Sequence, residues 1–106
     1  MISTLIIEDE IAFINTLQIM LEQKPQFSID GVARSCQEGI QAIKKLRPDL
    51  VFLDVKLGDG TGFDVLEALP KYDFQIVFVT AYDHFALDAF RFSAFDYLLK
   101  PIVSTD

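Results

Sequence analysis

Five polar residues with complementary chemistry each stand at the end of a short apolar run. Three are carboxylic acids, one carries a hydroxyl and one carries an amine: Glu8, Asp9, Asp54, Thr80 and Lys100. Carboxylates that are brought together raise each other's pKa unless a cation lies between them. Oxygen ligands without His or Cys suit Mg²⁺, which takes one or two protein carboxylates and keeps several waters. These residues therefore predict a site for a divalent cation.

The same groups could also receive a phosphoryl group. A carboxylate can act as a nucleophile and form an aspartyl-phosphate, and Asp54, at the end of a strongly apolar run, is the candidate. Mg²⁺ and Lys100 would neutralise the phosphoryl oxygens, and Thr80 would supply a hydroxyl donor. The residue types thus predict phosphoryl transfer to a carboxylate, provided that the fold brings them together.

The apolar runs themselves predict the elements that position these residues. Four consecutive apolar residues, Leu50–Leu53, follow the break at Pro48, as is typical of a strand buried on both faces. We expect such strands at residues 4–7, 27–33, 50–54, 75–80 and 94–99, with the loosely alternating 27–33 strand at an edge. Helical spacing and proline breaks predict helices at residues 11–23, 36–46, 62–69 and 83–92.

This alternation of strands and helices predicts an α/β fold with parallel strands joined by right-handed crossovers. The carboxyl ends of parallel strands lie at one edge of the sheet, and ligands of open α/β folds bind there. The five polar residues would therefore meet at that edge.

The overall composition narrows the possible functions. A chain of 106 residues, 51% of them hydrophobic, is expected to form one domain. Its net charge of −7 argues against direct contact with nucleic acid. No apolar run approaches the roughly 18 residues of a membrane span, and we expect no membrane association. The sequence has no signal-peptide pattern, and its single cysteine, Cys36, cannot form an internal disulfide. We therefore expect a cytoplasmic domain.

In their order along the chain, these residues resemble the motifs of a response-regulator receiver domain of two-component signalling. The elements are the acidic pair Glu8-Asp9, the strand-end Asp54, Thr80 followed by the small Ala81, and Lys100-Pro101 preceded by Tyr97. The segments FVTAYDHFALDAF (78–90) and DYLLKP (96–101) further resemble receivers of the LytTR (LytR/AlgR) family. The resemblance covers residues 1–106 and implies a flavodoxin-like, doubly wound, five-stranded parallel sheet of order 2-1-3-4-5.

The resemblance implies a role for each residue of the site. Asp54 would accept phosphate from a phosphohistidine on a sensor histidine kinase or a phosphotransfer protein. Asp9, Asp54 and the backbone carbonyl of Lys56 would hold Mg²⁺, with Glu8 acting on the metal directly or through water. The phosphoryl oxygens would be bound by Thr80, Ala81 and Lys100. The domain would thus be a signalling module and not an enzyme, apart from catalysing its own phosphorylation and dephosphorylation.

The resemblance also implies a switch role for Tyr97 and a cis peptide bond before Pro101. Tyr97 would be an aromatic switch that moves inward as Thr80 is drawn to the phosphate. The Lys100-Pro101 peptide would be cis, which places the ammonium of Lys100 in the cleft.

A partner surface is predicted at residues Asp83–Tyr97. This stretch holds more aromatic residues than one short helix and strand can bury, and surplus exposed aromatics mark interaction sites; they are Phe85, Phe90, Phe92, Phe95 and Tyr97. We expect a homodimer through this face. We also expect that the natural protein continues beyond Asp106, with the missing fifth helix and an output domain that binds DNA and regulates transcription.

Two alternatives remain open at this stage. The chain could be a receiver-like interaction module that works without phosphorylation. Asp59-Gly60-Thr61 is also similar to a motif of haloacid dehalogenase phosphatases, but that family needs a second carboxylate two residues after its nucleophile, where this chain has Lys56.

Overall fold

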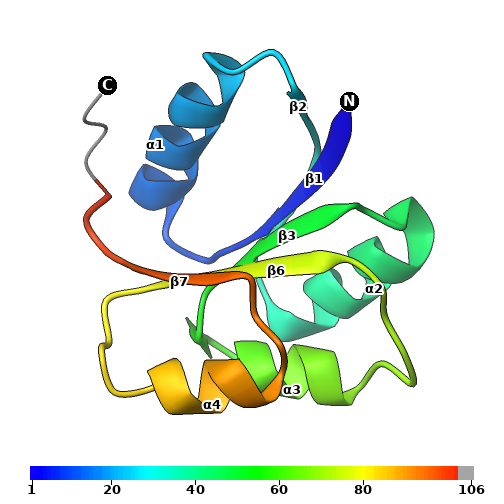
Figure 1. Ribbon diagram of the computed structural model, residues 1–106, viewed down its shortest axis with the longest axis vertical. Helices are drawn as coiled ribbons and strands as arrows, with labels where there is room; N and C mark the ends of the chain where they lie inside the picture. The colour runs from blue at the N-terminus through cyan, green and yellow to red at the C-terminus, as the bar shows by residue number, and fades with distance from the viewer. Residues whose placement is uncertain (103–106) are drawn as a thin grey trace.

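A five-stranded parallel sheet forms the centre of the computed structural model, which describes residues 1–102 (Figure 1). The strands run in the order β2-β1-β3-β6-β7, and their pairings are parallel. They are β1 (Ile2–Ile7), β2 (Phe27–Ala33), β3 (Leu50–Leu53), β6 (Gln75–Thr80) and β7 (Asp96–Leu99). The expected flavodoxin-like strand order is confirmed, including the edge position of β2.

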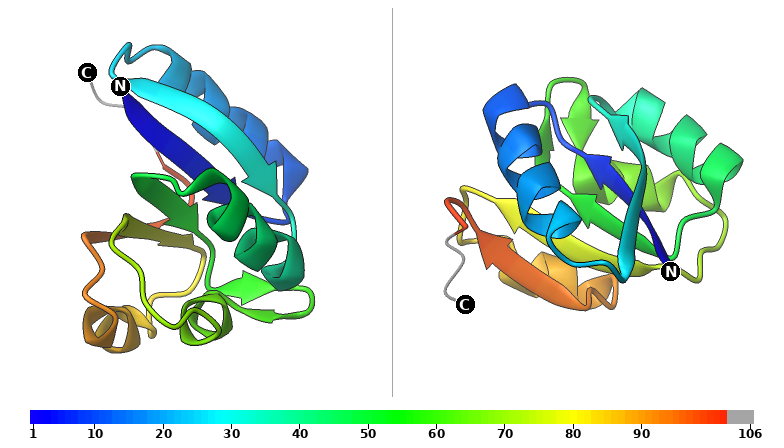
Figure 2. Two further views of the ribbon diagram at one scale, coloured as in Figure 1. Left: turned by 90° about the vertical axis from the view of Figure 1, so that its right-hand side faces the viewer. Right: turned by 90° about the horizontal axis from the view of Figure 1, so that it is seen from above.

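Helices cover both faces of the sheet (Figure 1 and Figure 2). One face packs against α1 (Ile11–Glu22), and the other packs against α2 (Cys36–Leu46), α3 (Gly62–Glu67) and α4 (Ala86–Arg91). Successive side chains of a strand point to opposite faces. Leu53 and Phe78 therefore join the core under α2, α3 and α4, whereas their neighbours Phe52 and Val77 join the core under α1.

A short hairpin that the sequence analysis did not predict follows β3. Its strands, β4 (Lys56–Leu57) and β5 (Gly60–Thr61), pair antiparallel. Gly60 has a φ of 155°, a conformation that favours glycine. The hairpin leads directly into α3, so it fixes the start of that helix beside the end of β3.

The elements around α4 are shorter than expected. The helix begins at Ala86 and not at residue 83, and Phe85 before it makes no side-chain cap. It ends at Arg91, and Ser93 then takes a left-handed conformation with a φ of 58°. The last strand begins only at Asp96. The apolar and aromatic pattern thus identified both elements but overestimated their lengths, because the turn between them needs residues that the pattern assigned to helix and strand.

The fifth helix that we expected after Pro101 would fall on residues 103–106 and beyond. These residues lie outside the described part of the chain, so the helix stays a prediction. Within residues 1–102, no helix is long and apolar enough to cross a membrane.

Gly62 packs against the end of β3 and provides a test of the fold. A Cβ at this position would lie 2.5 Å from the carbonyl oxygen of Asp54, which belongs to the backbone and cannot move aside cheaply. We predict that Gly62→Ala lowers the free energy of unfolding by about 1–3 kcal/mol, as overpacking does. Gly58→Ala is the matched control, because a Cβ there meets nothing within 4 Å. Equal midpoints of urea denaturation for the two variants would contradict the prediction.

Candidate functional site

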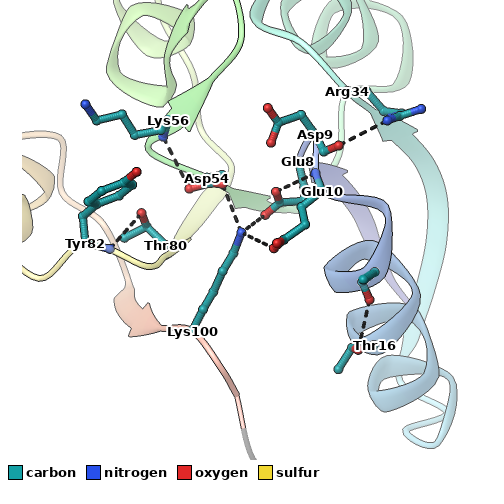
Figure 3. A network of polar contacts seen from close by, with 11 residues as sticks. Glu8, Asp9, Glu10, Thr16, Arg34, Asp54, Lys56, Thr80, Tyr82 and Lys100 are labelled. Carbon is teal, nitrogen blue, oxygen red and sulfur yellow. Dashed lines mark hydrogen bonds and ion pairs between the residues drawn. The ribbon is translucent and has the colours of Figure 1, made fainter.

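The register of the sheet brings the polar strand ends to one edge. Ile7 pairs with Leu53, so Glu8 and Asp54 are the next residues of two neighbouring strands. The Asp54 amide donates a hydrogen bond of 3.0 Å to the Ile7 carbonyl, which extends the ladder past the last pair. β6 and β7 end side by side in the same way, with Lys100 just beyond the last pair. The acids and the amine therefore meet, as Figure 3 shows.

Lys100 lies at the centre of this edge. Its Nζ atom is 2.9 Å from Glu8 Oε1, 3.1 Å from Glu10 Oε1 and 3.2 Å from Asp54 Oδ2. The same ammonium is 4.6 Å from the centre of the Phe13 ring, a distance typical of a cation–π contact. Burial lowers the pKa of Lys100, but the surrounding carboxylates outweigh burial and raise the pKa well above its usual value. The amine is therefore firmly charged.

Glu8 is the most deeply buried acid of the site, with 2% of its surface exposed. Its Oε2 accepts a hydrogen bond of 3.0 Å from the Glu10 amide. Its Oε1 faces the ammonium of Lys100 but is left without a hydrogen bond of good geometry. Burial raises the pKa of Glu8 from its usual 4.5 to about 7, an effect that the charge of Asp54 reinforces and the Lys100 contact opposes.

The carboxylate cluster fits a divalent cation. Glu8, Asp9 and Asp54 each offer one oxygen, and these oxygens lie within 4.8 Å of one another. The donors are hard oxygen atoms, as Mg²⁺ prefers, and the Glu8 carboxylate has an oxygen, Oε1, that lacks a hydrogen bond. Arg34 donates a hydrogen bond of 3.2 Å to the backbone carbonyl of Asp9 and so fastens the loop that carries this acid.

Asp54 opens onto a pocket of about 610 Å³. Its Oδ1 accepts a long hydrogen bond of 3.4 Å from the Lys56 amide, and Oδ2 contacts Lys100. The pocket is lined by Asp9, Glu10, Ala12, Phe13, Thr16, Asp54, Lys56, Ala81, Tyr82, Lys100 and Pro101. A small molecule that enters this pocket meets the Asp54 carboxylate and the Lys100 ammonium together.

Thr80 and Tyr97 are joined through the backbone of one residue, Tyr82. Thr80 is fully buried, and its hydroxyl accepts a hydrogen bond of 3.3 Å from the Tyr82 amide. The Tyr97 hydroxyl donates to the Tyr82 carbonyl. The ring of Tyr97 is half-buried, with its centre 6.3 Å from that of Phe78, and burial raises the pKa of its hydroxyl. The Lys100–Pro101 peptide is cis.

Sequence analysis missed Glu10 as a member of the site. It follows the acidic pair directly, where a negative charge is favourable at the start of a helix whatever its other contacts. The contact with Lys100 joins residues that are 90 positions apart in the sequence, so no local signal identified it.

Asp59 and Thr61, which suggested a phosphatase motif, each stabilise the start of a helix. Asp59 accepts hydrogen bonds of 2.7 Å and 3.2 Å from the amides of Cys36 and Gln37, and these bonds lower its pKa. Thr61 accepts one of 3.1 Å from the Asp64 amide, and its own amide donates to the Asp64 carboxylate at 2.9 Å. Asp59 therefore stabilises the start of α2, and Thr61 forms a capping box at the start of α3.

Comparison with known proteins decides the family. The sequence model of the response regulator receiver domain matches residues 4–106. The chain belongs to the response-regulator receiver family. The receiver domain is a signalling module and not a member of an enzyme family, as the sequence analysis predicted.

The curated relatives are longer than this receiver. It is 42% identical to the transcriptional regulatory protein BtsR of Escherichia coli over 103 residues. The aligned region covers 96% of this chain and 43% of BtsR. It is 39% identical over 103 residues to the sensory transduction protein LytT of Bacillus cereus, and this alignment covers 95% of this chain and 42% of LytT. The receiver thus spans less than half of these proteins. The match to LytT confirms the predicted likeness to LytTR-type receivers.

Solved structures agree with this assignment. The receiver domain of HemR from Leptospira biflexa is 30% identical, with a TM-score of 0.82 and coverage of 97% of this chain and 85% of that one. The response regulatory domain of mrkE from Klebsiella pneumoniae is 29% identical, with a TM-score of 0.81 and coverage of 95% and 84%. Both share the fold of this receiver.

The buried carboxyl of Glu8 predicts how stability depends on pH. Because its pKa in the folded receiver, about 7, is above the usual 4.5, the stability that it contributes is fully present below about pH 4.5 and is lost as the pH rises through about 7. Glu8→Gln cannot ionise. We predict that, in the presence of a chelator, the free energy of unfolding of Glu8→Gln increases relative to that of the wild type as the pH rises from about 5 to about 8.

Urea denaturation of both proteins across this range measures the difference. A difference in unfolding free energy that stays constant with pH would show that Glu8 does not titrate in this way.

Proposed function

We propose that this receiver accepts a phosphoryl group on Asp54 from the phosphohistidine of a sensor histidine kinase or a phosphotransfer protein, in a reaction that depends on Mg²⁺. One observation carries the proposal. The Asp54 carboxylate lines an open pocket while it shares the Lys100 ammonium, at 3.2 Å, with a cluster of acids that fits a divalent cation. A nucleophile, a fixed positive charge and metal ligands thus lie within one site.

In the proposed reaction an oxygen of Asp54 forms a bond to phosphorus, and the bond from phosphorus to the imidazole nitrogen breaks, with its electron pair returning to that nitrogen. Mg²⁺, held by Glu8, Asp9, Asp54 and the backbone carbonyl of Lys56, would neutralise charge on the phosphoryl oxygens. Lys100 adds a second positive charge, and its raised pKa keeps it protonated. The Thr80 hydroxyl and the Ala81 amide are proposed to donate to the remaining oxygens.

The same contacts support a route from the phosphate to the surface. If the Thr80 hydroxyl turns toward the phosphoryl group, it leaves the Tyr82 amide that it accepts from at 3.3 Å. The carbonyl of the same residue, in the next peptide unit, accepts from the Tyr97 hydroxyl. A shift of the Tyr82 backbone therefore moves the partner of the Tyr97 hydroxyl, and we propose that Tyr97 then turns inward and alters the face formed by α4 and β7.

That face carries apolar side chains that lie in water. Phe90 is 80% exposed and Phe95 is 72% exposed. Exposed aromatic residues of this size favour interaction sites, so we propose that a second copy of the receiver binds here when Asp54 is phosphorylated.

The relatives support the proposed output. BtsR is named as a transcriptional regulatory protein, and this receiver covers 43% of its length. We propose that the receiver works in the cytoplasm and controls transcription through a separate DNA-binding domain. The net charge of −7 of the receiver itself is unfavourable for binding phosphate backbones.

Asp54→Asn tests the phosphorylation. The amide nearly matches the carboxylate in shape but is a poor nucleophile, so we predict a folded receiver that takes up no phosphoryl group. The measurement is intact mass after incubation with acetyl phosphate, with Mg²⁺ or with a chelator. Wild type should gain one phosphoryl group only with Mg²⁺. Full labelling of the variant would remove Asp54 from its role, and no labelling of the wild type by acetyl phosphate or a phosphorylated kinase would favour an interaction module that works without phosphorylation.

Phe90→Glu tests the interface. A charge at an exposed position leaves the fold intact but opposes burial against a second copy. We predict that sedimentation shows a dimer of wild type with acetyl phosphate and Mg²⁺, and a monomer of Phe90→Glu. Ile19→Glu is the control, because Ile19 is 58% exposed on α1, on the opposite face of the sheet. Equal dimerisation of both variants would place the interface elsewhere.

A further inference from the structure

The carboxylates that surround Lys100 are not equivalent. Glu8 and Asp54 are buried and belong to the cluster that fits a metal. Glu10 lies outside that cluster, and 59% of its side chain is exposed. Among the described residues, Lys100 is the only polar partner of the Glu10 carboxylate, at 3.1 Å. Glu10 is therefore the contact that Lys100 can exchange most easily.

The start of α1 gives a second, independent observation. Glu10 occupies the N-cap position with an extended backbone (φ −89°, ψ 108°), yet its side chain makes no capping hydrogen bond. Residues at this position usually cap the helix through a short side chain, as Ser35 does for α2. The longer side chain of Glu10 instead reaches across the pocket to Lys100, as Figure 3 shows.

The ammonium of Lys100 has three N–H donors, and three carboxylates lie within 3.2 Å of it. A phosphoryl group on Asp54 would bring additional strong acceptor oxygens to the same ammonium. These oxygens would compete with the existing partners for the ammonium. Asp54 carries the phosphoryl group and Glu8 is buried beside the metal cluster, so the exposed Glu10 is the partner that is displaced most easily.

We propose that Glu10 is a positioning residue that holds Lys100 in the unphosphorylated receiver and competes with the phosphoryl group for it. The inference rests on the proposed phosphorylation of Asp54. Glu10 stabilises the resting state, and its release from Lys100 accompanies phosphorylation. The identity of the residue after the acidic pair thereby tunes how readily the receiver accepts a phosphoryl group.

The test uses beryllofluoride, a mimic of a carboxylate-bound phosphoryl group. Wild type, Glu10→Gln, Glu10→Asp and Glu67→Gln are titrated with it at saturating Mg²⁺ by calorimetry. Loss of a largely exposed ion pair should tighten binding by about two- to fivefold in Glu10→Gln. Glu10→Asp keeps the charge but is one methylene shorter, so it should behave like Glu10→Gln. Glu67→Gln removes the same charge from an exposed site at the end of α3 and should match the wild type.

Unchanged or weaker binding in Glu10→Gln would overturn the proposal. So would wild-type affinity in Glu10→Asp, because it would show that negative charge in the region matters and the contact with Lys100 does not.

A second measurement needs neither metal nor phosphoryl mimic. The rate at which acetic anhydride acetylates Lys100, followed by peptide mass spectrometry, should be higher in Glu10→Gln than in wild type and Glu67→Gln. Equal rates would overturn the proposal. If wild-type receiver fails to bind beryllofluoride, the proposed function fails, whereas the acetylation rates still decide whether Glu10 holds Lys100.

Discussion

The polar edge of the sheet depends on one partly buried ammonium, that of Lys100, which balances three carboxylates. Parallel strands force Glu8 and Asp54 to emerge side by side, and two buried negative charges at such a distance are costly without a cation. Lys100, delivered by the opposite end of the chain, supplies that cation within 3.2 Å of each acid. The free energy of the site is thus set by how positive charge is shared, and a metal ion or a phosphoryl group bound here would change that sharing.

Phe13 connects this charge balance to the hydrophobic core. Its ring lies 4.6 Å from the ammonium of Lys100 and also packs with Leu17 and Phe52 in the core under α1. A movement of Lys100 therefore changes the surroundings of a core residue. The chemistry of the edge and the packing of α1 cannot vary independently of each other.

The sequence was sufficient to predict the sheet and the meeting of the acids and Lys100 at one edge of it. Runs such as Leu50–Leu53 are too short and too apolar for a surface element, and parallel topology places the residue after each run at one edge. What it could not predict depends on long side chains and on turns. Glu10 reaches a residue 90 positions away. The length of α4 depends on the left-handed turn at Ser93. Such turns are usually predicted from a glycine, and this one has a serine instead.

The three helices on the sheet face opposite α1 are anchored unequally. Ser35 and Asp59 bind the start of α2, and a capping box holds the start of α3, so these two helices begin at well-anchored positions. The six-residue α4 has no side-chain cap and only Ala89 fully buried. Segments with few buried contacts open at the lowest free-energy cost. Substitutions on α4 can therefore accumulate with little effect on the edge that holds Asp54 and Lys100, so the surface that α4 presents is free to change while that edge stays the same.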